Sequence, residues 1–416
     1  MICEILSVGT ELLMGQIANT DAQYLSSRLS EFGINVYRHT VVGDNPARVK
    51  AALGEALARA DLVITSGGLG PTEDDLTKEM VGAYFGREMV LDQPSLDALN
   101  ARMNRLHPDV PLTQNNLKQA YFPEGARVLQ NLCGTAPGCV VTQGDKQVAV
   151  LPGPPSELKD MFERQLAPYL EKLTGRVIHS RFLRIVGVGE SRVETMLLDL
   201  FHLGTPTLAL YCAAGEVQAR ISVALCEGAD PLPILDPVEK EIRARLGLSV
   251  YAVGRDETMA STVVKLMRAN GQTLALAESC TGGMLASQVV DCPGASDVLT
   301  EAHVTYACAA KVRVLGVAPG TLEREGAVSD KCAREMAAGA RRISGADYAL
   351  SVTGVAGPDG GSAQTPVGTV FIGIAGPDGV RAEKFAFLGN RTWIRTLACL
   401  RALNMLREAL IADAQP

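Results

Sequence analysis

A serine, a tyrosine and a lysine in the last third of the chain have the types and spacing of a hydrolytic site. Ser279 follows the apolar stretch 274–277 and precedes two glycines, so it is predicted to lie where a buried strand ends and a helix begins. Tyr306 and Lys311 follow 27 and 32 residues later. A serine hydroxyl needs a base, and burial can lower a lysine pKa from about 10.4 toward 7–8 for that task. These residues predict a nucleophile, Ser279, a base, Lys311, and a tyrosine that orients or relays the proton.

The backbone N–H groups after Ser279 are the predicted donors to an oxyanion or a phosphate, and one such donor is typically worth ~10²–10³ in rate. They belong to Cys280, Thr281, Gly282 and Gly283. An ordinary interpretation competes with catalysis, because a serine at a helix start is usually an N-cap and a lysine on a helix is usually solvated. Spacing alone leaves both interpretations open.

A second candidate site is the segment 66–77, which combines glycines with acids. Its candidate ligand-binding residues are Gly67, Gly68, Gly70, Asp74 and Asp75. Glycines let the backbone approach a phosphate or a pterin closely, and the carboxylates would hold a divalent cation that neutralises phosphate oxygens. The alternative is helix capping, because Thr72-x-x-Asp75 fits a capping box. The segment is not a P-loop, since the Gly-Lys-Ser/Thr ending is absent.

Strands and helices alternate through the first 170 residues, with strands predicted at 3–8, 34–42, 62–65 and 148–151. This order implies a parallel sheet covered by helices on both faces, with ligands beyond the carboxyl ends of the strands. The turns at that edge add further candidates: Thr10, Glu11, Asp44, Pro152 and Gly153.

The rest of the chain shows two other orders of strands and helices. Residues 181–252 predict the order β-α-β-β-α-β, a small α+β unit. From about residue 256, strands at 273–277, 347–353, 367–375 and 380–388 are accompanied by helices, the last of them at 391–411. This part predicts a further α/β domain.

Length and composition bound the class of protein. At about 150 residues per domain, 416 residues predict two or three domains. A hydrophobic content of 47% with 20% charged residues is typical of a compact globular protein. The balance of 39 basic against 46 acidic residues, with 5% aromatics, argues against a broad nucleic-acid platform.

The same sequence predicts a cytoplasmic protein without a membrane anchor. No window approaches the ~18 apolar residues of a membrane span. The chain starts as a strand without a basic leader, so no signal peptide is evident. The ten cysteines include no Cys-x-x-Cys pair and are expected to be reduced.

Five segments resemble one protein family. Residues 8–15, 67–77 and 151–155 resemble the molybdopterin-binding-like domain of the competence/damage-inducible protein CinA family. Residues 277–283 (Ala-Glu-Ser-Cys-Thr-Gly-Gly) and 354–361 (Gly-Val-Ala-Gly-Pro-Asp-Gly-Gly) resemble its carboxy-terminal domain. The match covers essentially the whole chain in the right order. The expected domains are a parallel-sheet α/β domain at 1–172, an α+β (βαββαβ) unit at 173–254 and an α/β amidase domain at 255–416.

The resemblance implies a bifunctional hydrolase of pyridine-nucleotide salvage. The last domain would deamidate nicotinamide mononucleotide to nicotinate mononucleotide and ammonia without a cofactor. The first would hydrolyse ADP-ribose to AMP and ribose 5-phosphate with a divalent metal, magnesium or cobalt, held by Asp75 with Asp74 and Asp44. The implied partners are these nucleotides and a second copy of the chain in a homodimer, with no membrane or nucleic acid.

The family's deamidases use the serine, tyrosine and lysine at the matched positions. Further matched positions imply that Thr353 and Gly354 recognise the amide and that Arg391 binds the phosphate. One departure is visible: the family's Tyr-Ser-Asn-x-x-Lys is here Tyr-Ala-Cys-Ala-Ala-Lys, at 306–311. It removes two polar groups and leaves open whether their hydrogen bonds are needed. Two alternatives therefore stand: a molybdopterin-handling first domain, and a non-enzymatic nucleotide- or molybdopterin-binding competence protein with a degenerate amidase site.

Overall fold

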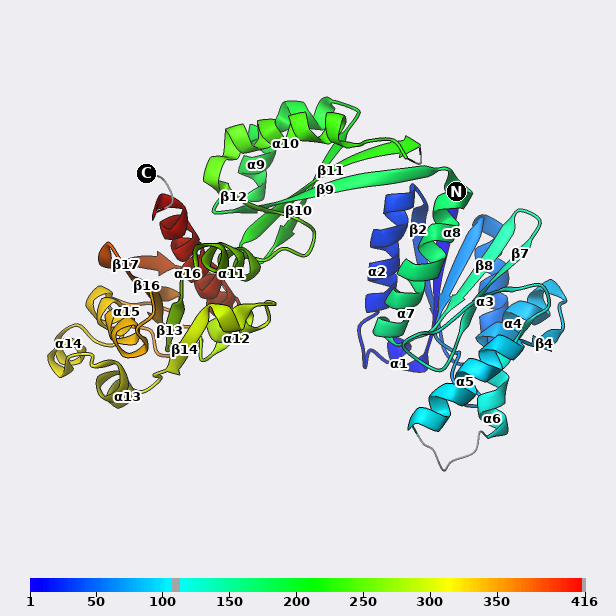
Figure 1. Ribbon diagram of the computed structural model, residues 1–416, viewed down its shortest axis with the longest axis horizontal. Helices are drawn as coiled ribbons and strands as arrows, with labels where there is room; N and C mark the ends of the chain where they lie inside the picture. The colour runs from blue at the N-terminus through cyan, green and yellow to red at the C-terminus, as the bar shows by residue number, and fades with distance from the viewer. Residues whose placement is uncertain (107–112, 227, 414–416) are drawn as a thin grey trace. The chain divides into compact units, whose positions relative to one another are not determined.

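The computed structural model describes residues 1–106, 113–226 and 228–413. They form two compact units, Met1–Ser180 with Val223–Leu232, and Arg181–Ser222 with Pro233–Pro416, which are described separately (Figure 1). No helix among the described residues is long and apolar enough to cross a membrane.

The first unit is built on a six-stranded sheet in the order β2-β1-β3-β8-β7-β6. Its strands are β1 (Ile2–Val8), β2 (Asn35–Val42), β3 (Leu62–Ser66), β6 (Arg127–Leu129), β7 (Gly138–Gln143) and β8 (Lys146–Leu151). The four strands predicted from the sequence are parallel neighbours, as expected. The antiparallel β7 and β6 at the edge were not predicted, because β6 has only three residues and the first four residues of β7 are all buried, so neither strand shows an alternation of apolar and polar residues.

Alternate residues of the central strands enter two cores, one on each face of this sheet. In β1, for example, Ile5 packs against one set of helices and Leu6 against the other. The helices, with a small β4–β5 sheet, are α1 (Thr10–Leu13), α2 (Thr20–Leu29), α3 (Pro46–Arg59), α4 (Thr77–Phe85), β4 (Met89–Leu91), α5 (Gln93–Leu106), α6 (Gln114–Leu117), β5 (Tyr121–Pro123), α7 (Pro155–Met161) and α8 (Ala167–Thr174). Helices α2, α7 and α8 cover one face, and α3 and α4 the other. The predicted layered α/β fold is confirmed.

The middle of the chain has the predicted order β-α-β-β-α-β. Its elements are β9 (Arg176–Val186), α9 (Glu190–Met196), β10 (Thr207–Ala213), β11 (Glu216–Cys226), α10 (Leu232–Leu246) and β12 (Val250–Val253). The four strands form one sheet in the order β10-β11-β9-β12.

The last part of the chain is a second layered α/β structure, with a five-stranded sheet in the order β14-β13-β15-β16-β17. Its elements are α11 (Met259–Asn270), β13 (Leu274–Glu278), α12 (Met284–Val290), β14 (Leu299–Val304), α13 (Cys308–Ala310), α14 (Pro319–Arg324), α15 (Asp330–Ser344), β15 (Tyr348–Gly354), β16 (Thr369–Gly376), β17 (Gly379–Ala386) and α16 (Arg391–Asp413). Strands β14, β13 and β15 are parallel, so their carboxyl ends lie at one edge. Strand β14 was missed because its side chains are mostly exposed and show no apolar alternation.

Candidate active sites

Strand β13 presents Ser279 at the carboxyl edge of the last sheet. All five residues of this strand are buried between β14 and β15. The N–H of Ser279 donates to the carbonyl of Val352 on β15 at 2.9 Å, which fixes the backbone at the point where the strand ends. The side chain itself is only half-buried, so a substrate can reach the hydroxyl.

Lys311 brings its amine to this hydroxyl. Its Nζ lies 3.0 Å from Oγ of Ser279, 2.6 Å from the carbonyl oxygen of Thr305 and 3.3 Å from that of Tyr306. The residue is 1% exposed, and burial lowers the pKa of its amine. Nζ donates to all three oxygens when it is protonated; in the neutral amine two N–H groups serve the carbonyls, which would leave the lone pair to accept the serine proton. The predicted serine–lysine pair is therefore in contact.

The departure from the family pattern lies outside these contacts. The side chains of Ala307 and Cys308 are exposed. Apart from Ser279, the partners of the Lys311 side-chain amine are backbone carbonyls. The backbone N–H of Lys311 donates to the carbonyl of Ala307 at 3.2 Å. Main-chain atoms hold the lysine whatever the side chains at 307 and 308, so the substitutions leave the three contacts of Nζ in place.

The start of α12 is capped by a residue that the sequence analysis did not single out. Glu278 is fully buried, and its carboxylate accepts from the N–H groups of Gly283 at 2.8 Å, Leu285 at 3.2 Å and Ala286 at 2.8 Å. The N–H of Gly282 donates to the carbonyl of Ser279 at 3.1 Å. The prediction that Gly282 and Gly283 donate to a ligand is therefore wrong, because the protein already uses both groups. A buried Glu directly before the serine was the available signal.

Two of the four predicted donors remain available. Within the described part of the chain, the N–H of Thr281 has no acceptor, and the N–H of Cys280 reaches only the sulfur of its own side chain. Burial raises the pKa of the Cys280 thiol to about 11, so this side chain is uncharged and unsuited to be a nucleophile. The hydroxyl of Thr281 is buried and has no partner among the residues that the structure describes, and the carbonyl of Thr281 accepts from Nη2 of Arg395 at 2.6 Å. The oxyanion donors predicted at 280–283 are thus reduced to the first two.

Tyr306 and Arg391 lie together at the rim of this site. The Tyr306 side chain is 61% exposed, and Nη2 of Arg391 donates to its hydroxyl at 3.2 Å. The second Arg391 nitrogen, Nη1, donates to the carbonyl of Gly357 at 2.8 Å. The tyrosine hydroxyl thus contacts Arg391, the residue predicted to bind phosphate, rather than the serine–lysine pair. Its predicted part in proton transfer gains no support from these contacts.

Thr353 and Gly354 end β15 beside the serine strand. The Thr353 hydroxyl is 1% exposed and donates to the carbonyl of Ala327 at 2.7 Å. Only its oxygen lone pairs are left for a ligand. At Gly354 a Cβ would lie 2.7 Å from the carbonyl oxygen of Thr369, so the glycine is needed for the close approach of two strands.

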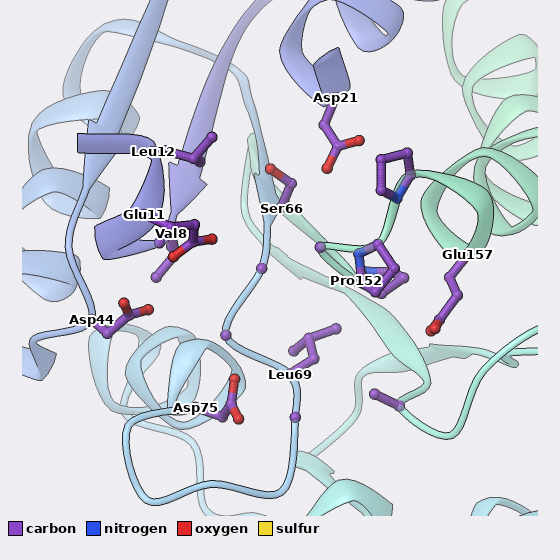
Figure 2. A pocket seen from close by; sticks show the side chains of 18 of the residues that line it. Val8, Glu11, Leu12, Asp21, Asp44, Ser66, Leu69, Asp75, Pro152 and Glu157 are labelled. Carbon is purple, nitrogen blue, oxygen red and sulfur yellow. The ribbon is translucent and has the colours of Figure 1, made fainter. Parts of the chain in front are cut away.

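The first unit contains a pocket of about 600 Å³ at the carboxyl ends of its parallel strands (Figure 2). The predicted residues that line it are Glu11, Asp44, Gly67, Gly68, Gly70, Asp74, Asp75, Pro152 and Gly153. Thr10 is not among the lining residues; its N–H donates to Oδ2 of Asp44 at 2.8 Å. The pattern of strands thus located the pocket, whereas Thr10 ties two of its turns together.

The glycine segment forms a row of backbone donors. Gly67 has φ +96°, and a Cβ there would lie 2.2 Å from the carbonyl oxygen of Val8. Its N–H donates to the carbonyl of Leu151, so that group is used. The next three N–H groups, at residues 68–70, have no acceptor within the described residues. Three successive free donors at the wall of a pocket suit an anion such as a phosphate.

The acidic run after the glycines is organised as a turn. Oδ2 of Asp75 accepts from the N–H of Thr72 at 3.0 Å and from its hydroxyl at 2.6 Å. The same hydroxyl contacts Oδ1 of Asp74 and holds the pKa of that carboxyl below its usual value. Helix α4 begins only at Thr77, so the capping box considered for Thr72 and Asp75 does not form.

Asp74, Asp75 and Asp44 do not form a preorganised metal cluster. No group of three or more His, Cys, Asp or Glu side chains within the described ranges is close enough to hold a metal. The oxygen-only donors fit magnesium, which is usually held by one or two carboxylates together with waters and substrate phosphates. Asp75 and Asp44 both line the pocket and would supply such carboxylates.

Two further lining residues were missed by the sequence analysis. Asp21, in the first turn of α2, is 8% exposed, has no hydrogen-bond partner among the described residues, and has its pKa raised to about 6 by burial. Gln119 is 1% exposed; its Nε2 donates to the carbonyl of Leu69 at 3.3 Å, and its Oε1 is buried without a partner. An acid in the first turn of a helix is usually explained by its interaction with the helix dipole, so the sequence offered no signal that Asp21 lines a pocket.

Comparison with known families gives three matches along the chain. Residues 4–172 match the family described as "Probable molybdopterin binding domain". Residues 180–252 match "Damage-inducible protein CinA KH domain", and residues 256–410 match "CinA C-terminal domain".

Full-length relatives carry the same arrangement. The chain is 47% identical over 412 residues to a "Putative competence-damage inducible protein" of Clostridium novyi, and 46% identical over 417 residues to a "CinA-like protein" of Kosmotoga olearia, each match covering 99% of both chains. A solved structure of a protein CinA "with unknown function" from Thermoplasma acidophilum matches 42% of this chain and 97% of its own, with 34% identity and a TM-score of 0.37.

Proposed function

The chain belongs to the CinA family, and from that premise we propose that it is a hydrolase of pyridine nucleotides with one site in each unit. For the second unit we propose the deamidation of nicotinamide mononucleotide. The observation that carries this proposal is the 3.0 Å contact between Oγ of Ser279 and the buried amine of Lys311, whose pKa is lowered by burial.

In the proposed reaction, Oγ of Ser279 attacks the carboxamide carbon while Nζ of Lys311 takes the hydroxyl proton. The N–H groups of Cys280 and Thr281 donate to the oxyanion that forms. Lys311 returns the proton to the leaving nitrogen, so that ammonia departs and an ester remains on Ser279. Water, deprotonated by the same amine, then hydrolyses the ester to nicotinate mononucleotide.

The groups around the serine would bind the rest of this substrate. Arg391 carries a guanidinium at the rim, in contact with the hydroxyl of Tyr306, and would bind the phosphate. The free lone pairs of the Thr353 hydroxyl would accept from the amide NH₂ group. In this proposal Tyr306 positions Arg391 rather than moving a proton.

The test is ammonia release from nicotinamide mononucleotide by the full chain and by Ser279→Ala and Lys311→Ala. Lys331→Ala is a matched control, because Lys331 is a half-exposed lysine of the same sheet-and-helix structure, 3.8 Å from Glu325. Activity that survives in the control and collapses in the first two variants is expected. A folded wild-type protein that releases no ammonia would exclude this substrate and favour the non-enzymatic alternative.

For the first unit we propose the hydrolysis of ADP-ribose to AMP and ribose 5-phosphate. The supporting observation is the 600 Å³ pocket whose wall combines three free backbone donors with the carboxylates of Asp44 and Asp75. The donors would bind the diphosphate, and the carboxylates would hold magnesium, which neutralises charge on the phosphate oxygens.

This second proposal is tested by AMP formation from ADP-ribose with magnesium, in the wild type and in Asp75→Asn. Loss of turnover in the variant is expected, with restored binding of ADP-ribose at high magnesium. Tight binding of a pterin without phosphate release would instead favour the molybdopterin-handling alternative. The expected homodimer and cytoplasmic location stay predictions.

A further inference from the structure

A largely buried acidic residue of the first unit, Asp21, faces the pocket without a hydrogen-bond partner among the described residues. Figure 2 shows the carboxylate of Asp21 pointing from the start of α2 into the pocket, on the side of Ser66 and Pro152 and away from Asp44 and Asp75. The side chain is 8% exposed, its Oδ1 is buried, and no hydrogen bond to it is present within the described residues.

The polar groups that share this part of the pocket are already paired with one another. Nδ2 of Asn19 donates to Oγ of Ser7 at 3.0 Å, and Oγ of Ser66 donates to the same atom at 3.2 Å. Neither donor is directed to Asp21. Lys159 is the charged side chain that acts on Asp21, and its ammonium lies over the ring of Tyr24, 5.4 Å from the centroid, without an ion pair to the acid.

A buried carboxylate without donors is unfavourable in the empty protein. Its two oxygens accept hydrogen bonds and cannot donate while the group is ionised. A ligand that fills the pocket would therefore be favoured if it presented hydroxyl or N–H donors at this point.

We propose that Asp21 binds the vicinal diol of a ribose, each carboxylate oxygen accepting from one hydroxyl. This inference rests on the proposed ADP-ribose site and deepens it. The glycine donors at 68–70 bind phosphate at one side of the pocket, and a ribose is the group covalently attached to that phosphate. Carboxylates that bind ribose hydroxyls beside a phosphate-binding glycine turn recur in nucleotide-binding sheets.

ADP-ribose contains two riboses, and the chemistry of the diol is the same in both. The experiment therefore uses two pairs of probes. AMP is compared with 2′,3′-dideoxy-AMP, and ribose 5-phosphate with 2-deoxyribose 5-phosphate. Dissociation constants are measured by calorimetry on the full chain with magnesium at pH 8, where the Asp21 carboxyl is ionised.

In the wild type, the probe with the diol is expected to bind about 10- to 100-fold more tightly than its deoxy partner, as for hydrogen bonds to a charged group. Asp21→Asn should abolish this preference in the pair that corresponds to the bound ribose, which identifies the ribose. The matched control is Asp330→Asn, which removes an acid from the first turn of α15 and should leave the preference unchanged.

Three results would overturn the inference: equal weakening of both members of a pair in Asp21→Asn, no effect of the substitution in either pair, or no binding of any probe to folded wild-type protein. Failure of the proposed function looks different. Discrimination of the diol without hydrolysis of ADP-ribose would retain the role of Asp21 and exclude the pyrophosphatase. Hydrolysis of ADP-ribose, together with an unchanged preference for the diol in Asp21→Asn, would retain the pyrophosphatase and exclude the role of Asp21.

Discussion

The two candidate sites bury an ionisable group in opposite ways. Lys311 is buried with three hydrogen-bond neighbours supplied by the protein, and its pKa is lowered. Asp21 is buried without any among the described residues, and its pKa is raised to about 6. In both cases burial favours the neutral form. The difference teaches that the proposed amidase site is complete in the free protein, whereas the pocket leaves the Asp21 carboxylate to be satisfied by a ligand.

The largest expected effect comes from removing the amine at the complete site. Lys311→Met keeps the length of the side chain and should lower deamidation by about 10³-fold or more, since no base remains. The melting temperature should change little, because relief from burying the amine is opposed by the loss of the donor to the carbonyls of Thr305 and Tyr306. Ammonia release and thermal unfolding measure the two effects. A variant that is inactive only because it unfolds would show that Lys311 acts structurally.

The pH dependence should identify the base. Because burial lowers the pKa of Lys311 below its usual 10.5, the active neutral amine forms as pH rises through that lowered value. kcat/KM for deamidation should therefore rise with pH and level off before pH 10.5. Tyr306→Phe should keep the profile and raise KM, because its hydroxyl contacts Arg391. A profile that moves in Tyr306→Phe would assign the titration to the tyrosine.

Glu278→Gln tests how the amidase site is held together. The carboxylate accepts from three N–H groups of the α12 start, and an amide retains a single oxygen for them. We expect a loss of about 1–3 kcal/mol in the free energy of unfolding, measured in urea, with a lower kcat because Ser279 is the next residue. Unchanged stability would mean that water replaces the cap.

Asp21→Asn should raise the free energy of unfolding, whereas Glu278→Gln should lower it. The folded-state pKa of about 6 lies above the usual 3.8, so the carboxyl destabilises the fold as pH rises through about 4 to 6. At pH 8 the variant should be more stable than the wild type by at most about 3 kcal/mol, and the gap should close below pH 4. Denaturation at both pH values measures this. A less stable variant at pH 8 would indicate a partner for Asp21 in the free protein.

The smallest effect is expected where the chain departs from its family. Restoring the family residues with Ala307→Ser and Cys308→Asn should change kcat by less than about threefold, because backbone carbonyls hold the Lys311 amine and both side chains are exposed. Ammonia release again provides the measurement. A large gain in activity would show that the missing polar groups act on the substrate.

Local patterns were sufficient for most elements that carry the sites. Asn45 followed by Pro46 is the local pattern of an N-cap and a first helical residue, and the Asn45 side chain does accept from the N–H of Arg48 at the start of α3, at 3.1 Å. Strand β14 and the antiparallel pair β6–β7 lay beyond such patterns. The exposed strand β14 and the three-residue strand β6 bury too few alternating side chains to leave a period in the sequence, and β7 leaves none because its first four residues are all buried.

By itself, the sequence determined where the two sites lie, because glycine turns after apolar strands of an alternating α/β chain meet at one sheet edge. It also determined the pairing of Ser279 with Lys311 as a possibility. Only the tertiary structure decided which groups are left to react or bind. Glu278 accepts from the N–H groups at the helix start, and among the described residues the N–H of Thr281 has no acceptor and Asp21 has no donor. These outcomes depend on burial and hydrogen bonding between elements distant in sequence, which no local pattern contains.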